Sequence, residues 1–258
     1  MRLTIKDIQI KKNRGQKITV LTAYDYPMAK MLDESGMDII LVGDSLGMVV
    51  LGYDSTVPVT MRDMLHHTKA VSRAVKKSLV VTDLPFGSYD TVERALRNAK
   101  RCLKEAGADA VKLEGAFQIQ DQLSALIQAG IPVMGHIGLT PQTASSLGGH
   151  KVQGKDAESA KKILEEAKLL EKLGVFSVVL ECIPRDLAAQ ITQTIKCPTI
   201  GIGAGPDTNG QVLVLHDMLG FEGKVSPKFV KKYVSLEQEI KKAVSAYRDE
   251  VLSGKFPL

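Results

Sequence analysis

An amphipathic helix, a glycine and a short run of β-branched residues recur in this order along the chain of 258 residues. The glycines of the four clearest copies are Gly36, Gly107, Gly130 and Gly174. Glycine readily adopts the left-handed conformation that ends a helix, and a strand after each helix is typical of a parallel α/β fold. The repeat therefore predicts a parallel sheet whose strands alternate with helices.

Counting the β-branched runs gives eight strands. They are Ile18–Thr22, Ile39–Val42, Leu79–Thr82, Ala110–Leu113, Val133–Gly135, Ser177–Leu180, Thr199–Ile202 and Gln211–Leu215. The chain length matches the ~250 residues typical of a (β/α)8 barrel, whereas an open doubly wound sheet usually has fewer strands and a switch point, which this pattern does not show. We therefore predict a single-domain (β/α)8 TIM barrel over residues 1–258, with a short N-terminal capping helix at Thr4–Lys12 and a last helix and tail at Phe229–Leu258.

Four of the predicted strands run directly into a carboxylate. These acids are Asp44, Asp83, Glu114 and Glu181, and His136 follows a fifth strand. All strand carboxyl ends of a parallel barrel lie on one side, where barrel enzymes place their chemistry. Any one of these acids alone is more often the N-cap of the next helix, but four on one rim repel one another unless a proton or a cation lies among them. Carboxylates without paired His or Cys ligands favour Mg²⁺ over Zn²⁺.

Three further features of the rim allow two interpretations each. Lys112 and Glu114 are two residues apart on one strand and should face the same way, so Lys112 can bind the metal's anionic ligand or form a salt bridge to Glu114 or to an acid of a neighbouring strand. His136 can donate a hydrogen bond to a substrate or be a satisfied rim histidine. The glycine-rich run Gly201–Gly205 can cradle a phosphate or allow tight packing.

Composition and charge exclude several classes of protein. The formal charge of +5 is carried by scattered lysine pairs with few aromatics, which argues against a nucleic-acid partner and supports only a mild preference for anionic small molecules. The sequence shows no signal peptide and no apolar stretch of about 18 residues, so we expect no membrane contact. Three cysteines without a CxxC pair predict a reduced, cytoplasmic protein. No GxSxG, P-loop or GxGxxG pattern points to hydrolase, kinase or dinucleotide chemistry.

Longer motifs cover the chain from about Tyr24 to Phe221. They are Leu41–Met48, Val57–Thr60, Asp83–Tyr89, Val111–Gly115, Gly135–Gln142, Val152–Lys155, Pro198–Gly205 and Gly210–Val214. In this order they resemble the ketopantoate hydroxymethyltransferase (3-methyl-2-oxobutanoate hydroxymethyltransferase) family. The departures are slight, with Ala116 where the family commonly has glycine and Asn209 where aspartate is usual.

The resemblance implies a role for most of the rim residues. Asp44 and Asp83 would bind Mg²⁺, and Glu114 would complete the metal's shell directly or through water. Ser45 and Lys112 would hold the keto acid together with the two aspartates. The family also implies a homodecamer of two pentameric rings.

The reaction implied by the resemblance moves a one-carbon unit from 5,10-methylenetetrahydrofolate onto C3 of 3-methyl-2-oxobutanoate, giving 2-dehydropantoate in pantothenate biosynthesis. A 2-keto acid can chelate Mg²⁺, which would stabilise the enolate formed when C3 loses its proton. Glu181 would accept that proton. Because an ordinary carboxylate, with a pKa of about 4.3, is too weak a base for a carbon acid, we expect Glu181 to be desolvated.

Two alternatives remain from the residues. Another Mg²⁺-enolate barrel, of the phosphoenolpyruvate mutase and isocitrate lyase type, shares the layout of acids but typically carries a cysteine in a catalytic loop. Here Cys102 lies within a predicted helix, and Cys182 and Cys197 show no such context. A non-catalytic barrel would bind keto acid and metal but would not exchange the proton at C3.

Overall fold

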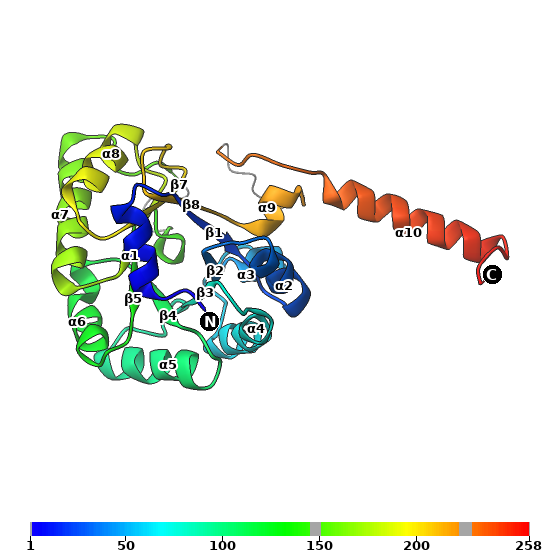
Figure 1. Ribbon diagram of the computed structural model, residues 1–258, viewed down its shortest axis with the longest axis horizontal. Helices are drawn as coiled ribbons and strands as arrows, with labels where there is room; N and C mark the ends of the chain where they lie inside the picture. Colours follow the sequence, from blue (N-terminus) through cyan, green and yellow to red (C-terminus); the bar gives the residue numbers. More distant parts are fainter. Residues whose placement is uncertain (1, 145–150, 222–228, 258) are drawn as a thin grey trace. The chain divides into compact units, whose positions relative to one another are not determined.

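The computed structural model describes residues 2–144, 151–221 and 229–257. It contains two compact units, Met1–Val212 and Leu213–Leu258. The first unit is built on a closed barrel of parallel strands in the order β1 to β8, which confirms the predicted (β/α)8 fold (Figure 1). The strands are β1 Ile18–Thr22, β2 Ile39–Val42, β3 Leu79–Asp83, β4 Ala110–Glu114, β5 Val133–Gly138, β6 Ser177–Glu181, β7 Thr199–Ile202 and β8 Gly210–Leu213.

Helices alternate with the strands as the glycine repeat predicts. They are α2 Tyr26–Glu34, α3 Leu46–Val49, α4 Met61–Ala74, α5 Val92–Lys104, α6 Gln120–Gln128, α7 Ala157–Leu173 and α8 Arg185–Thr194, with short 3₁₀ turns at Phe117–Ile119 and Pro141–Thr143. All four repeat glycines have positive φ, between 74° and 101°. Because a Cβ is strained in this region, each glycine stops its helix and turns the chain into the next strand.

The third, fourth and sixth strands each include one residue more than predicted, Asp83, Glu114 and Glu181, and two other predicted strand ends are wrong by two or three residues. The fifth strand does not stop at Gly135, because Ile137 and Gly138 continue to pair with β6. His136 therefore lies within β5 and not at its end. The eighth strand ends at Leu213, and Leu215 already begins a short helix, α9 (Leu215–Leu219).

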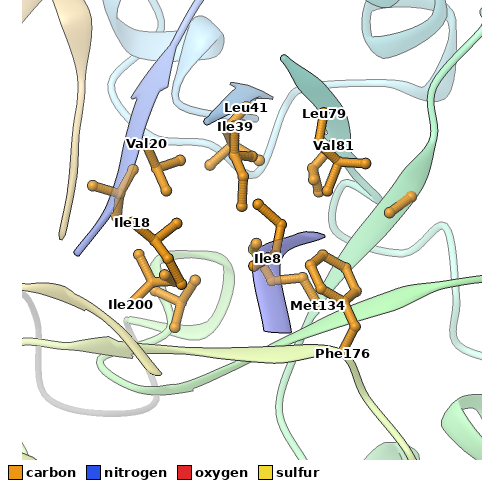
Figure 2. Close-up of a cluster of buried hydrophobic side chains, with 13 residues drawn as sticks. Ile8, Ile18, Val20, Ile39, Leu41, Leu79, Val81, Met134, Phe176 and Ile200 are labelled. Atoms are coloured by element: carbon orange, nitrogen blue, oxygen red, sulfur yellow. The ribbon is translucent and has the colours of Figure 1, made fainter. Parts of the chain in front are cut away.

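The predicted capping helix is α1, Ile5–Asn13, which begins with a capping box between Thr4 and Asp7. Ile8 is fully buried and lies among inward-facing side chains of the strands, including Ile39 and Met134 (Figure 2). The apolar side of α1 thus completes the core at the amino ends of the strands. The charged side of α1 is tied to the barrel by an ion pair between Lys11 and Asp38.

The second unit contains α9 and the long helix α10, Leu236–Leu252. Helix α10 lies within Phe229–Leu258, the segment predicted to supply the last helix. Ion pairs from Glu237 to Lys241 and from Glu239 to Lys242 lie along α10. Among the described residues, none of the helices has the length and apolar character needed to cross a membrane.

Candidate active site

The register of three neighbouring strands brings four predicted site residues together. Asp83 on β3 pairs with Lys112 on β4, and Glu114 on β4 pairs with His136 on β5. Lys112 Nζ lies 2.7 Å from Asp83 Oδ1, and His136 Nδ1 lies 3.4 Å from Glu114 Oε1. In the described structure, Lys112 therefore makes the salt bridge to a neighbouring strand's acid, one of its two predicted interpretations.

Asp44 and Glu181 complete this group from either side. The backbone N–H of Asp44 donates to Asp83 Oδ2 over 3.1 Å, which fixes the loop after β2 against the end of β3. On β6, Glu181 Oε2 lies 3.1 Å from His136 Nε2. His136 thus lies between Glu114 and Glu181 at ion-pair distance from both, although neither ring nitrogen has hydrogen-bond geometry to a partner among the described residues. The four acids therefore lie together at one rim of the barrel, as the sequence predicts.

The buried acids strongly affect one another. Asp44 is only 4% exposed, and burial together with the charges of Asp83 and Glu114 raises its pKa well above the ordinary value. Burial disfavours the charged form of Lys112, but the same three acids outweigh burial and raise the pKa of Lys112. Lys112 is therefore always an ammonium at neutral pH, yet it does not neutralise the cluster.

His136 contributes a second positive charge. Burial and the Lys112 ammonium disfavour the imidazolium, but the contacts with Glu114 and Glu181 raise the pKa of His136 to about 9. At neutral pH the ring is therefore protonated and faces both carboxylates. Even if the raised pKa of Asp44 leaves that acid protonated, the other three carboxylates outnumber the two cations, so the rim keeps an excess of negative charge.

Ser45 lies where the chain turns from β2 into α3. Its hydroxyl is 2.8 Å from the Tyr24 hydroxyl, which holds it at the rim. Gly43 lies two residues earlier, and a Cβ there would lie 2.8 Å from Ser45 Oγ, so the serine side chain would have to move from its position. Glycine at this position lets the strand end approach the Ser45 hydroxyl.

Glu181 differs from the buried acids in its surroundings. Its side chain keeps 16% exposure, whereas that of Glu114 is 3% exposed. Glu181 is therefore desolvated in part, because most of its side chain is buried while the carboxylate reaches the solvent-facing edge of the cluster. Its closest charged contact is the His136 ring.

The residue after Glu181 is strained. Cys182 has φ 46°, in the left-handed region that disfavours side chains, and backbone hydrogen bonds to Ile202 and Gln153 hold it there. Such strain concentrates at functional sites. Burial and the Glu181 charge raise the pKa of the Cys182 thiol to about 11. Cys182 is therefore a neutral thiol at neutral pH, unsuited to act as a nucleophile.

The glycine-rich run after β7 is tightly packed. A Cβ at Gly201 would lie 2.7 Å from Thr208 Oγ1, and one at Gly205 would lie 2.7 Å from Arg185 Cγ. Arg185 in turn pairs with Asp207. Close packing, one of the two predicted interpretations, therefore accounts for these glycines.

Sequence reasoning missed two residues of the site, Gln142 and Tyr89. Gln142 is 3% exposed; its side-chain Nε2 donates to Asp44 Oδ2 over 2.8 Å, and its backbone N–H donates to Glu114 Oε2 over 3.0 Å. The Tyr89 hydroxyl donates to Gln142 Oε1 over 2.6 Å. Their positions at the ends of the motifs Asp83–Tyr89 and Gly135–Gln142 are the sequence signal that points to them.

Comparison with known proteins identifies the family. The family model described as ketopantoate hydroxymethyltransferase matches residues 2–258. The 3-methyl-2-oxobutanoate hydroxymethyltransferase of Moorella thermoacetica is 58% identical over 257 residues, covering 99% of this chain and 96% of that protein. That of Syntrophus aciditrophicus is 57% identical, covering 99% and 94%. The chain belongs to the ketopantoate hydroxymethyltransferase family.

Solved structures show the fold on which this ketopantoate hydroxymethyltransferase family member is built. Phosphonopyruvate hydrolase in complex with oxalate and Mg²⁺ has a TM-score of 0.61 at 14% identity, covering 97% of this chain and 87% of that one. A 2,3-dimethylmalate lyase of the PEP mutase/isocitrate lyase superfamily has a TM-score of 0.62 at 14% identity, covering 100% and 90%. At this identity the likeness extends to the barrel alone.

The residues of this family member fit a hard cation held by two carboxylates. Within residues 2–144, 151–221 and 229–257, no three His, Cys, Asp or Glu side chains are arranged to hold a metal by themselves. Mg²⁺ commonly binds one or two carboxylates and takes its other oxygens from substrate and water. Burial and the charges of Asp83 and Glu114 raise the pKa of Asp44, and a cation bound there would favour its ionised form.

Proposed function

We propose that this protein transfers a hydroxymethyl group from 5,10-methylenetetrahydrofolate to C3 of 3-methyl-2-oxobutanoate, giving 2-dehydropantoate in pantothenate biosynthesis. The observation that carries the proposal is the position of Glu181, a partly exposed carboxylate beside a cluster of buried acids with excess negative charge. The cluster suits a metal that binds a 2-keto acid, and Glu181 lies next to it as a base. Family relatives at 54% to 58% identity over nearly the whole chain support this assignment.

Asp44 and Asp83 would hold Mg²⁺, which when bound supplies positive charge for the keto oxygen as C3 loses its proton. Lys112 supplies charge of its own. Its ammonium has three N–H donors, and the contact with Asp83 Oδ1 uses one of them. The others can bind the substrate carboxylate. Ser45, held by Tyr24, offers a hydroxyl to the same ligand.

Glu181 accepts the C3 proton in this proposal. The His136 ring holds Glu181 through Oε2, so the carboxylate is oriented before the substrate arrives. The electron pair of the broken C–H bond is held at C3 and the keto oxygen, and C3 then forms a bond with the methylene carbon carried by the folate. Both carbon–nitrogen bonds of that methylene break, one water molecule supplies the oxygen of the new hydroxyl group and protons for the folate nitrogens, and tetrahydrofolate leaves. Because His136 is itself held by Glu114, the two carboxylates and the ring form one chain of contacts.

Assembly and location are part of the same proposal. We infer a homo-oligomer, with the decamer implied by the family, because Val244, Tyr247 and Leu252 on α10 are exposed and an intersubunit contact would bury them. Analytical ultracentrifugation tests this directly. All three cysteines are free thiols, which suits the reducing cytosol.

The test is hydrogen exchange at C3. Purified protein is incubated with 3-methyl-2-oxobutanoate in D₂O, with and without Mg²⁺, and the C3 proton is followed by NMR. We expect Mg²⁺-dependent exchange without folate, and 2-dehydropantoate once 5,10-methylenetetrahydrofolate is added. Binding without exchange would instead identify a non-catalytic barrel. Turnover of phosphonopyruvate or 2,3-dimethylmalate without hydroxymethyl transfer would identify a lyase.

A further inference from the structure

We infer that Gln142, oriented by Tyr89, is a positioning residue that holds Asp44 and Glu114 in the arrangement the metal requires. The inference rests on the proposed function, because it concerns the same metal. It starts from a buried amide that no catalytic step uses. Gln142 lies in the 3₁₀ turn after β5, yet its contacts reach the loops after β2 and β3 and the end of β4.

The orientation of the Gln142 amide follows from its neighbours. Nε2 lies 3.0 Å from the carbonyl oxygen of Leu84 and 2.8 Å from Asp44 Oδ2. A carbonyl oxygen can only accept, so the nitrogen and not the oxygen must face Leu84. A flipped amide would place Oε1 against two acceptors. Oε1 therefore faces the Tyr89 hydroxyl, which donates to it over 2.6 Å.

Gln142 constrains the rotation of two acids at once. Within the described ranges, its amide is the side chain that donates to Asp44, and it does so at one oxygen. Its backbone N–H donates to Glu114 Oε2, while Glu114 Oε1 faces His136. Asp83 needs no such help, because Lys112 and the Asp44 N–H hold its two oxygens. Gln142 thus limits the rotation of the Asp44 and Glu114 carboxylates, as Lys112 and the Asp44 N–H limit the rotation of the Asp83 carboxylate.

Tyr89 acts through Gln142. Its hydroxyl also lies 3.4 Å from the carbonyl oxygen of Glu114, but its short contact is with the amide. Removing the hydroxyl leaves Gln142 Oε1 without its donor and holds the amide less firmly against Leu84 and Asp44, whereas removing the amide leaves the hydroxyl without an effect on Asp44. The two residues should therefore be non-additive, as members of one hydrogen-bonded chain are.

The experiment measures Mn²⁺ binding to the metal-free protein without substrate, by the electron paramagnetic resonance signal of free Mn²⁺. Gln142→Met keeps the volume but loses the donors, and should raise the Kd about 10-fold to 100-fold, as the loss of groups that orient metal ligands does elsewhere. Tyr89→Phe loses one hydrogen bond and should raise the Kd by roughly twofold to tenfold. The double variant should match Gln142→Met alone.

A matched control is Thr192→Val. The Thr192 hydroxyl pairs with Ala188 and Thr199 away from the acids, so its loss should lower the melting temperature and leave the Kd within about twofold. Asp83→Asn serves as the reference for a lost ligand. A wild-type Kd in Gln142→Met, with binding lost in Asp83→Asn, overturns the inference and leaves the metal site standing.

Other outcomes are also decisive. Unchanged binding in Asp83→Asn, or no binding by the wild type, overturns the proposed metal site and the inference with it. Additive effects of Tyr89→Phe and Gln142→Met would show that Tyr89 acts by another route, against the inference. If Gln142→Met does not fold, Tyr89→Phe decides alone, and an unchanged Kd there overturns the positioning role.

Discussion

Two buried aspartates at opposite ends of the barrel, Asp33 and Asp44, have opposite electrostatic surroundings. They are 3% and 4% exposed. Asp33, in the last turn of α2, accepts hydrogen bonds from the backbone N–H groups of Lys76, Lys77 and Ser78 and from the Ser78 hydroxyl. Asp44 faces other carboxylates and accepts from the Gln142 amide.

The pKa values of the two acids move apart for this reason. Burial alone would raise the pKa of Asp33, but its hydrogen bonds outweigh burial and lower it. Burial, Asp83 and Glu114 raise the pKa of Asp44. The charge of Asp33 stabilises the fold, whereas the charge of Asp44 destabilises it until a cation binds. Burial alone therefore does not distinguish a structural acid from a functional one. The distinction lies in whether hydrogen-bond donors or other carboxylates surround the acid.

The largest effect is expected at the catalytic end, from Glu181→Gln. The amide keeps the size of the side chain but cannot take the C3 proton, so exchange at C3 should fall by ~10²–10⁴-fold. Affinity for keto acid and the melting temperature should stay near wild type. NMR exchange rates measure this, with Glu165→Gln, an exposed residue of α7, as control. Wild-type exchange in Glu181→Gln would move the base to another group.

Asp44→Asn should separate activity from stability. It removes one charge from the cluster and keeps an oxygen for Gln142, so turnover should fall by about 10³-fold, equal to losing roughly 4 kcal/mol of metal assistance. The metal-free protein should be as stable as wild type or more so, because the raised pKa of Asp44 means that its charge opposes folding at neutral pH. Urea unfolding with chelator measures this; a clear loss of stability would contradict the comparison.

Asp33→Asn is the counterpart at the other end. The amide turns an N–H₂ toward backbone donors, so unfolding free energy should fall by about 2–3 kcal/mol while kcat stays unchanged. Because the pKa of Asp33 is lowered in the folded protein, the stability that Asp33 contributes should decrease as the pH falls. The Asp33 contribution is present above the ordinary aspartate pKa and is lost as pH falls through the lower folded value. Urea unfolding between pH 2 and pH 7 tests it, and a loss of activity without a loss of stability would refute it.

His136 predicts the opposite pH dependence for the catalytic end. Its pKa is raised to about 9 in the folded protein, so its contribution to stability is present below the unfolded value near 6.5 and is lost as pH rises toward 9. In chelator, stability should fall over this window with a slope of at most about 1.4 kcal/mol per pH unit from this group. His136→Gln should flatten that slope. An equal slope in the variant would assign the proton elsewhere.

The smallest effect is expected at Cys182, where strain lies at the catalytic end. A side chain on a left-handed backbone costs ~1–2 kcal/mol, and Cys182→Gly removes this cost. The glycine also makes the unfolded chain more flexible, which opposes the gain. The net change in unfolding free energy should be within about 1 kcal/mol and favourable. Cys182→Val, with a branched Cβ at the same φ, should be destabilised. Equal stability of the two variants would show that backbone strain at Cys182 does not affect the stability of the catalytic end.

Much of the barrel was predictable from local chemistry. Gly36 and Gly174 stop helices because of their φ, and Asp83, Glu114 and Glu181 end their strands, as the runs of β-branched residues predict. These features depend on a few neighbouring residues. The extent of β5 was not predictable, because Gly138 stays in the strand only through its pairing with β6.

The contacts of the site depend on the closed barrel. The pairing of Asp83 with Lys112 follows from the stagger between β3 and β4. Gln142 and Asp44 are separated by 98 residues, and no local pattern specifies their contact. The sequence therefore predicts which acids lie on the rim, while the hydrogen bonds that orient them appear only when the loops are placed.

Helix α1 has a consequence for the order of folding during synthesis. It precedes all eight strands, yet Lys12 donates to the carbonyl oxygens of Ile195 and Cys197, and Gln9 donates to that of Lys196. Lys12 and Ile195 are 183 residues apart, so α1 leaves the ribosome long before its acceptors exist. The ion pair with Asp38 can form earlier, but the docking of α1 is complete only when the segment before β7 is in place. Protection of the α1 amides from exchange would therefore mark the moment at which a nascent chain has closed its barrel.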